Sequence, residues 1–269
     1  ISPPTSVRWL ASTPQKAKKL AWDASSGRLF TVDGDRSEIM ALKGGAPEKT
    51  IALADMAPVA VAADPKGFLW IFDEKESQLV KLDAGGQVRL KVGSSGSREG
   101  YFAGVRDLLF GREGLIYVAD TRNDRIQVFN SEGLFLKVFA RAANDQPLEY
   151  PIALAQDEAG RLYVLCGKRK VVVCLDTKGR AVREIGGGPA EPERLDDPVG
   201  LAVYGTEVMV LDAGAKRIKV FSLAGKYLRE FGAGGNENGD FAEPAGLLFT
   251  DKGRLLVADP GNQKVLAFQ

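Results

Sequence analysis

Two glycine markers recur along this chain with nearly the same spacing. The first marker comes before a central apolar run, at Gly27, Gly67, Gly114, Gly160, Thr206 in place of a glycine, and Gly253, with intervals of 40, 47, 46, 46 and 47 residues. The second comes before the next-but-one run, at Gly45, Gly86, Gly133, Gly179 and Gly225, with intervals of 41, 47, 46 and 46 residues. A repeat of this length with four short strands per unit is typical of β-propeller blades.

Each repeat contains the same series of strands. The first, rich in small residues that suit a crowded axis, is predicted at Leu20–Trp22, Val59–Ala63, Asp107–Phe110, Ile152–Ala155, Gly200–Val203 and Gly246–Phe249. The second is almost entirely apolar, which indicates a strand covered on both faces; it is predicted at Leu29–Val32, Leu69–Phe72, Leu115–Ala119, Leu162–Leu165, Val208–Leu211 and Leu255–Ala258. Turns such as Asp64-Pro65-Lys66-Gly67 join the two, with a glycine where positive φ is needed.

The sixth repeat ends after its third strand, Val265–Phe268, and lacks a fourth. The segment Val7–Ala11 resembles the fourth strand of another repeat, Val182–Gly186. We therefore predict that an N-terminal strand at about residues 6–12 pairs with Val265–Phe268 and closes the ring, because an open sheet would leave two unpaired edges. The predicted fold is all-β, a single domain over residues 1–269 with six four-stranded antiparallel blades.

Composition excludes several classes of function. The chain has 269 residues, no histidine and a net charge of +1. Without histidine there is no His-ligated zinc, no Ser-His-Asp triad and no Cys-His dyad. No apolar run approaches the ~20 residues that a membrane-spanning helix needs, so we expect no membrane insertion by this segment. The first residue is Ile1, so we expect the chain to be part of a longer or processed protein.

The two cysteines, Cys166 and Cys174, fall on the two strands of one predicted hairpin. Cys166 is expected opposite Val171 or Val172, which leaves Cys174 two or three positions out of register. Such a diagonal is roughly 7 Å or more, too long for a disulfide. We expect two buried thiols.

Three segments carry a family resemblance. Tyr117–Phe129 reads YVADTRNDRIQVF, Val257–Val265 reads VADPGNQKV, and Gly239–Leu247 reads GDFAEPAGL. With the repeat spacing, they resemble the NHL-repeat family of six-bladed β-propellers over nearly the whole chain. The resemblance implies a structural pair at the turn between second and third strands, here Asp120 with Arg125, Asp212 with Arg217 and Asp259 with Lys264. Three repeats depart from it, with Asp73 facing Gln78, Cys166 facing Val171, and Asp33 facing Glu38 unless Arg36 compensates.

A ligand-binding face is predicted where these turns meet the loops that lead into each first strand. Cations gather there in three consecutive repeats, and the candidate ligand-binding residues are Arg98, Tyr101, Arg106, Arg122, Lys168, Arg169, Lys170 and Lys216. The alternative is a solvated face, since acids such as Glu149, Asp196 and Glu243 oppose the basic arc. Tyr101 and Phe241 also have a structural interpretation, as aromatic residues packed between blades.

The sequence indicates no catalytic residue, no metal ligand and no cofactor. Asp107 is the one acid early in a first strand, and the adjacent Arg106 is expected to neutralise it. We expect a non-catalytic binding propeller, a monomeric domain that presents its loop face to a protein, a peptide or an anionic polymer. The alternatives are a lactonase-like hydrolase dependent on a divalent metal, and single-stranded RNA binding as in some animal relatives of the resembled family. The sequence does not fix the compartment; an exported location is the one we favour.

Overall fold

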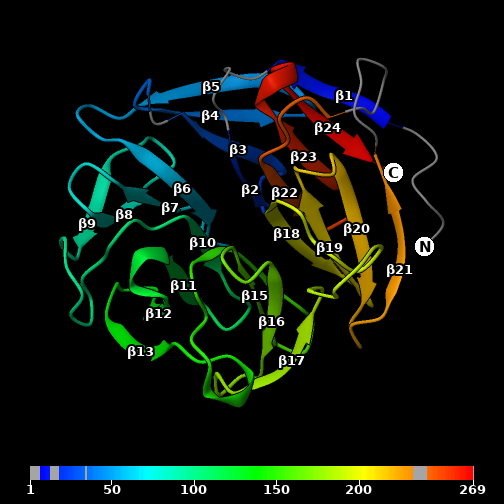
Figure 1. Ribbon diagram of the computed structural model, residues 1–269. Helices are drawn as coiled ribbons and strands as arrows, with labels where there is room; N and C mark the ends of the chain where they lie inside the picture. The colour runs from blue at the N-terminus through cyan, green and yellow to red at the C-terminus, as the bar shows by residue number, and fades with distance from the viewer. Residues whose placement is uncertain (1–6, 13–17, 34, 233–240, 269) are drawn as a thin grey trace.

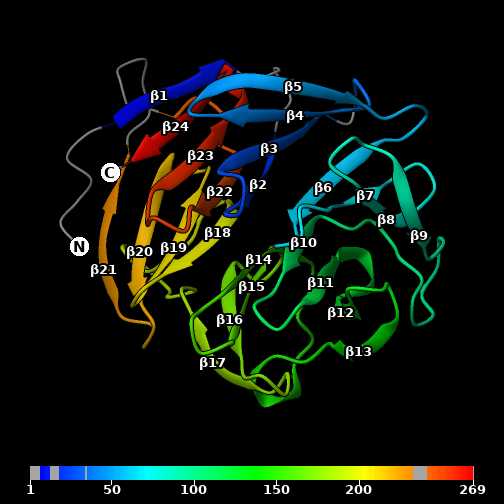
Figure 2. The same cartoon turned by 180° about the vertical axis from the view of Figure 1, so that it is seen from behind.

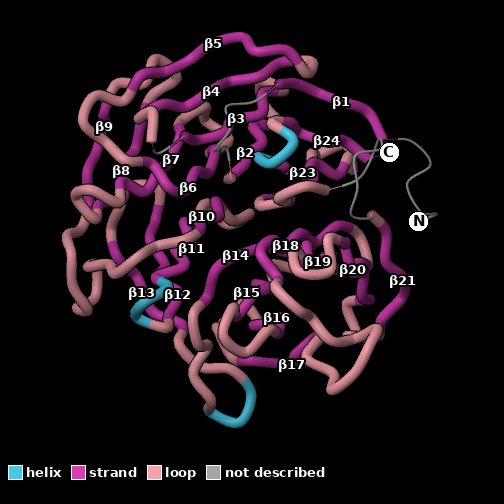
Figure 3. The backbone as a smooth tube through the Cα atoms, turned by 45° about the horizontal axis from the view of Figure 1, so that its top comes forward, coloured by secondary structure: helices cyan, strands magenta, loops and turns pink. Residues whose placement is uncertain are grey.

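The computed structural model describes residues 7–12, 18–33, 35–232 and 241–268. These residues form six four-stranded antiparallel sheets, arranged as blades around a common axis (Figures 1 and 2). The tube view in Figure 3 shows that strands and loops make up nearly all of the backbone. The prediction of an all-β, six-bladed propeller is confirmed.

The blades follow one another in chain order. Blade 1 holds β2 (Lys19–Asp23), β3 (Arg28–Asp33), β4 (Glu38–Lys43) and β5 (Ala46–Ala52), and blade 2 holds β6 (Pro58–Ala63), β7 (Leu69–Asp73), β8 (Gln78–Leu82) and β9 (Val88–Val92). Blade 3 holds β10 (Asp107–Phe110), β11 (Leu115–Asp120), β12 (Arg125–Asn130) and β13 (Phe135–Phe139), and blade 4 holds β14 (Pro151–Gln156), β15 (Leu162–Cys166), β16 (Val171–Leu175) and β17 (Ala181–Ile185). Blade 5 holds β18 (Pro198–Tyr204), β19 (Glu207–Asp212), β20 (Arg217–Ser222) and β21 (Tyr227–Phe231). Short 3₁₀ turns lie at Thr121–Asn123, Ala143–Asp145 and Pro260–Asn262.

Blade 6 joins the two ends of the chain. It holds β22 (Gly246–Phe249), β23 (Leu255–Asp259) and β24 (Lys264–Phe268), and its outer strand is β1 (Val7–Ser12). The pairing of β1 with β24 runs from Val7 opposite Phe268 to Ser12 opposite Lys264, with one irregularity between Trp9 and Ala11. The predicted closure is therefore confirmed, and β1 covers an edge of β24 that would otherwise be unpaired.

The core lies between adjacent blades. Every residue of β7, β15 and β23 is buried, as expected for strands covered on both faces. Between blades 2 and 3, Phe102 has no exposed surface and its ring meets the rings of Phe72 and Phe129 at centroid distances of 5.3 and 5.7 Å. Phe241, predicted to pack between blades, is likewise fully buried beside Phe268.

Turn chemistry sets the spacing that the sequence shows. In the turn between β6 and β7, Asp64 Oδ1 accepts the backbone N–H groups of Lys66 and Phe68 at 2.8 and 3.0 Å. Gly67 closes this turn at φ +84°, a backbone conformation that favours glycine. The same arrangement recurs at Asp157 in blade 4, which explains the regular glycine markers.

Both cysteines are free and buried, and Cys166 lies opposite Val171 as predicted. No helix among the described residues is long and apolar enough to cross a bilayer.

Candidate functional site: the vestibule on the axis

Buried aspartates hold the loops that lead into the inner strand, the first strand of each blade. The clamp aspartates, defined as Asp73, Asp120, Asp212 and Asp259, have no exposed surface. Asp120 Oδ1 accepts the backbone N–H of Ala103 at 2.7 Å, and Asp259 accepts those of Ala242 and Glu243 at 2.9 and 2.8 Å. Each clamp ties the end of a second strand to the loop entering the same blade, which fixes the position of that loop.

The predicted turn pairs have different outcomes. Arg125 Nε lies 2.7 Å from Asp120 Oδ2, so this pair forms as expected. Arg217 lies opposite Asp212 in the strand register but bonds to Glu230 at 2.7 Å instead. Glu230 thus takes the place predicted for Asp212, whose two oxygens accept the backbone N–H groups of Asp196 and Asp197, each at 2.8 Å.

The other turns follow the sequence register. Asp259 lies opposite Lys264. In blade 1, Asp33 lies opposite Glu38, and Arg36 stands 3.7 Å from a carboxylate oxygen of each. Arg36 therefore supplies the compensation that two facing acids require.

A vestibule opens on the axis at the face that carries the entering loops. It consists of two adjoining hollows, of about 720 and 460 Å³, and both are lined by Lys18, Lys19, Arg106, Glu243 and Pro260. The larger hollow adds acids from blades 1 and 2, Asp35 and Glu74. The smaller one adds apolar and aromatic side chains from blades 4 to 6, chiefly Tyr150, Ile152, Val199 and Pro244.

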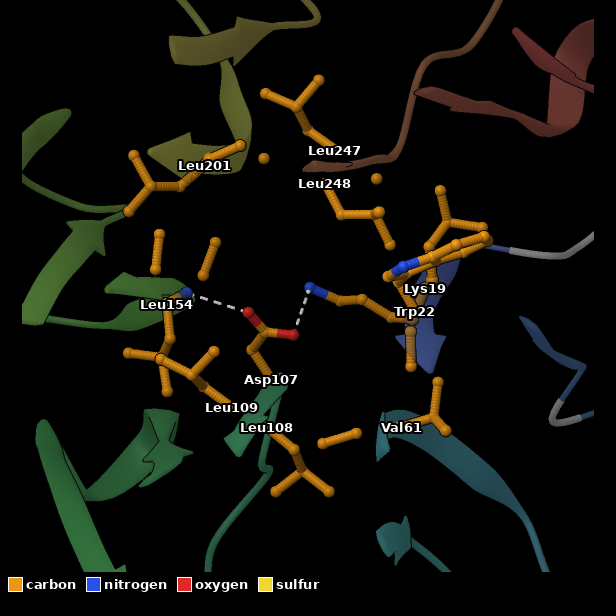
Figure 4. Close-up of a pocket in the computed structure, with 18 of the residues that line it drawn as sticks. Lys19, Trp22, Val61, Asp107, Leu108, Leu109, Leu154, Leu201, Leu247 and Leu248 are labelled. Carbon is orange, nitrogen blue, oxygen red and sulfur yellow. Dashed lines mark hydrogen bonds and ion pairs between the residues drawn. The ribbon is translucent and has the colours of Figure 1, made fainter. Parts of the chain in front are cut away.

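Lys19 and Asp107 form an ion pair directly beneath the vestibule. Lys19 Nζ lies 3.3 Å from Asp107 Oδ1 and 3.3 Å from the carbonyl oxygen of Ile152. Asp107 Oδ2 accepts the backbone N–H of Leu154 at 2.8 Å. Figure 4 shows the two side chains meeting in the middle of the channel, so the pair links blades 1, 3 and 4 across the axis.

This pairing corrects the expectation that Arg106 neutralises Asp107. Successive side chains of an extended strand point in opposite directions, so Arg106 is badly placed to reach its neighbour. Arg106 is exposed and has no ion-pair partner among the described residues. Burial raises the pKa of Asp107 above its ordinary value, although Lys19 and the Leu154 N–H both act to lower it.

A central cavity of about 260 Å³ lies below the vestibule and shares Lys19 with it. Its wall comes from the inner strands of all six blades, mostly leucine, valine and alanine side chains such as Leu109, Leu201 and Leu248. At the far mouth, three residues further along their strands, stand Trp22, Phe110 and Phe249, each half-buried.

The predicted ligand-binding residues are divided by the fold. Arg106 lines the vestibule. Lys168 lines neither hollow, but its ammonium lies 5.6 Å from the ring centre of Tyr150, which lines the smaller one. Arg169 bonds to both carboxylate oxygens of Glu184 at 2.8 Å, so its charge is already neutralised. The remaining members are exposed and line neither hollow: Arg98, Tyr101, Arg122, Lys170 and Lys216.

Tyr101 does not pack between blades. It is 39% exposed, and the adjacent Phe102 fills the position between blades that the sequence interpretation gave to Tyr101. Lys18, Lys19 and Tyr150 line the site and were not predicted. Lys18 and Lys19 could have been predicted from the sequence, since they directly precede the first predicted inner strand, Leu20–Trp22, and the site is formed by the segments that lead into such strands.

Within the described ranges, no group of three or more Cys, Asp or Glu side chains is placed to hold a metal ion. The vestibule acids Glu74 and Glu243 belong to blades 2 and 6. The arrangement offers charged hydrogen-bonding groups and an apolar wall on a rigid frame, which suits binding.

Comparisons with known proteins agree on the architecture. No protein-family model matches the chain. Protein brain tumor from Drosophila melanogaster is 27% identical over 146 residues, which cover 53% of this chain and 14% of that protein. A gluconolactonase from Xanthomonas campestris has a similar structure, with a TM-score of 0.73 and 16% identity over 99% of this chain and 94% of that one. Virginiamycin B lyase from Staphylococcus aureus has a TM-score of 0.67 and 16% identity over 92% of this chain and 78% of that one. At these identities the structural similarities show the fold alone.

Proposed function

We propose that this chain is a non-catalytic binding propeller of the NHL-repeat type, which holds an acidic peptide segment of a protein partner in its vestibule. The motifs at Tyr117–Phe129 and Val257–Val265 support the family assignment, together with the six blades. Function in a propeller resides in the site and not in the fold, so the proposal depends on the vestibule.

The smaller hollow carries the proposal. Three cations line it, Lys18, Lys19 and Arg106, against a single acid, Glu243. Because Lys19 is engaged by Asp107, the cations available to a ligand are Lys18 and Arg106, both exposed and without an ion-pair partner among the described residues. Apolar side chains stand beside them. A carboxylate next to an apolar residue, as in an acidic peptide, complements this surface.

Two other functions are less well supported. Single-stranded RNA binding relies on a basic groove with aromatic side chains on which bases stack, whereas Glu74 and Glu243 interrupt the positive charge here and Tyr150 is half-buried under Lys168. A hydrolase that uses a divalent cation needs several converging oxygen ligands. The carboxylate nearest the axis, Asp107, is engaged by Lys19 and by a backbone N–H.

The test is a binding measurement with a fluorescein-labelled decaglutamate peptide, followed by anisotropy. Lys18→Glu combined with Arg106→Glu should weaken binding at least 10-fold, since the two cations available to the peptide become repulsive. The matched control is Lys178→Glu with Lys252→Glu, which reverses two exposed lysines at turns outside both hollows and should change affinity less than about two-fold.

Equal weakening in both double variants would mean that the peptide senses overall charge and not the vestibule. A ten-nucleotide oligouridylate serves as the competing probe. Tighter binding of the RNA than of the peptide, with a steep fall in affinity as salt rises, would replace the peptide proposal with RNA binding.

A further inference from the structure

The ion pair of Lys19 with Asp107 spans a channel whose wall is otherwise apolar, and peptide binding in the vestibule does not require it. Strand register places Lys19 opposite Val32 and Asp107 opposite Ala119. Lys19 and Asp107 therefore occupy the same position in their blades: each lies opposite the last residue but one of the second strand. The equivalent positions of the other four blades are Ala60, Ala153, Gly200 and Gly246. The channel thus carries one positive and one negative group at a level where every other blade has a small residue.

The axial pair, Lys19 with Asp107, has hydrogen-bonding capacity beyond the contacts described. An ammonium has three N–H donors and a carboxylate about four acceptor sites. Lys19 makes two contacts, to Asp107 and to the carbonyl of Ile152, both at 3.3 Å. Asp107 accepts from Lys19 and from the Leu154 N–H. A ligand that carries a donor and an acceptor at one end can add to the pair without disrupting it.

The cavity next to the pair suits the rest of such a ligand. Its volume of about 260 Å³ exceeds the ~150 Å³ at which an apolar protein cavity already holds a benzene-sized molecule. Leu109, Leu154, Leu201 and Leu248 surround the space (Figure 4). The axial pair and the far mouth with Trp22 and Phe110 are separated by three residues of strand, or roughly 10 Å. This length accommodates a six-carbon chain together with its head group.

We propose that the central cavity is a binding site for a small uncharged amphiphile, with a donor–acceptor head group on Lys19 and Asp107 and an apolar tail directed toward Trp22. The pair has no net charge, so a neutral head adds no unbalanced charge to a site that is mostly removed from water. An anionic head group would be repelled by the carboxylate of Asp107, and a cationic head group by the ammonium of Lys19. The site lies below the vestibule and is independent of the acidic peptide proposed to bind there.

Three probes with the same tail test the head-group assignment: hexanamide, hexanoate and hexylammonium. Hexanamide should bind with a dissociation constant near or below about 1 mM, measured by isothermal titration calorimetry and ligand-observed NMR. The two charged probes should bind at least 10-fold more weakly. Absence of hexanamide binding at about 10 mM, or equal affinity for a charged probe, would overturn the proposal.

Two charge variants should change this preference in opposite directions. Asp107→Asn leaves Lys19 as the single charge and should make hexanoate the tightest of the three probes. Lys19→Met leaves Asp107 and should favour hexylammonium. Unchanged preference in both variants, each shown to be folded by cooperative melting, would mean that the axial pair does not contact the ligand.

A filled cavity provides the second check. Leu248→Trp places a larger side chain in the space and should abolish hexanamide binding, and Leu109→Trp does the same from blade 3 if the first variant does not fold. The matched control is Val182→Trp, at a 52% exposed position on the outer strand of blade 4. Hexanamide binding that survives in a folded cavity variant would place the probe elsewhere and refute the proposal.

Discussion

Lys19 and Asp107, which are 88 residues apart in the chain, meet at 3.3 Å on the axis of the ring. Their side chains are 17% and 16% exposed, so the pair is mostly removed from water. It connects blade 1 to blade 3, and each partner also bonds to the backbone of blade 4. The pair therefore separates the vestibule from the central cavity and holds non-adjacent parts of the ring together.

We expect Lys19→Met to lower the free energy of unfolding by about 2 kcal/mol, because the largely buried carboxylate of Asp107 then loses its cation. Replacing both partners, Lys19→Met with Asp107→Leu, should recover most of that loss. Urea unfolding measures both values, and Lys178→Met at an exposed turn is the control. A single variant as stable as the control would show that the pair contributes nothing to stability.

The raised pKa of Asp107 predicts a pH dependence. The folded protein holds this proton more tightly than the unfolded chain, so the folded state binds more protons in this range. The contribution of Asp107 to stability is therefore greatest below pH 3.8, its ordinary pKa, and falls as pH rises through the raised value. The difference in unfolding free energy between the wild type and Asp107→Asn should decrease between about pH 4 and pH 7. A difference that grows with pH would contradict the assigned direction.

The clamp aspartates should matter far more than the surface pairs at the same turns. Asp120→Ala is expected to lower the free energy of unfolding by about 3 kcal/mol, because it leaves the Ala103 N–H without its acceptor and removes the carboxylate partner of Arg125 Nε. Arg217→Met, which removes an ion pair from a 44% exposed side chain, should cost less than about 1 kcal/mol. Chemical denaturation of the two variants side by side decides whether this ranking holds.

Two glycines of similar backbone conformation give a matched comparison. Gly179 has φ +82°, and a Cβ there would lie 2.0 Å from the Phe139 ring. Gly114 has φ +74° with nothing within 4 Å of the same position. Gly114→Ala should cost about 1 kcal/mol through backbone strain, and Gly179→Ala at least about 1 kcal/mol more through overpacking. Equal melting temperatures would mean that the contact with Phe139 relaxes without penalty.

Removal of the chain up to Ser12 should open the ring at β24. We expect a lower melting temperature and concentration-dependent aggregation, because an edge of β24 is left unpaired. A synthetic peptide covering Val7–Ser12 should restore part of the loss in melting temperature, whereas a scrambled peptide should not. A truncated protein that melts like the intact one would show that closure through β1 is dispensable.

The architecture of six blades could be predicted from local sequence patterns. Three local patterns specify it: the glycine period, the apolar second strands and the incomplete sixth repeat. Together they favour a closed ring of blades, which pairs the backbone groups of every strand and buries the apolar side chains. Strand pairing therefore followed the predicted register, including Cys166 opposite Val171 and the closure of blade 6 by Val7–Ser12. The ion pair of Asp120 with Arg125 could also be predicted from the sequence, since the two residues are neighbours across a single turn.

Which charged side chains pair with one another depends on the folded ring. Arg106 is next to Asp107 in the chain, yet Lys19 of another blade is its partner. Arg169 bonds to Glu184, and Arg217 to Glu230 in place of Asp212. Lys19 and Asp107 are brought together by the packing of different blades, whereas Arg169 with Glu184 and Arg217 with Glu230 pair inside one blade, 15 and 13 residues apart, through side-chain direction. The hydrophobic period that specifies the blades carries no information about side-chain pairs of either kind. The composition of the vestibule and of the central cavity therefore becomes visible only when the ring is closed.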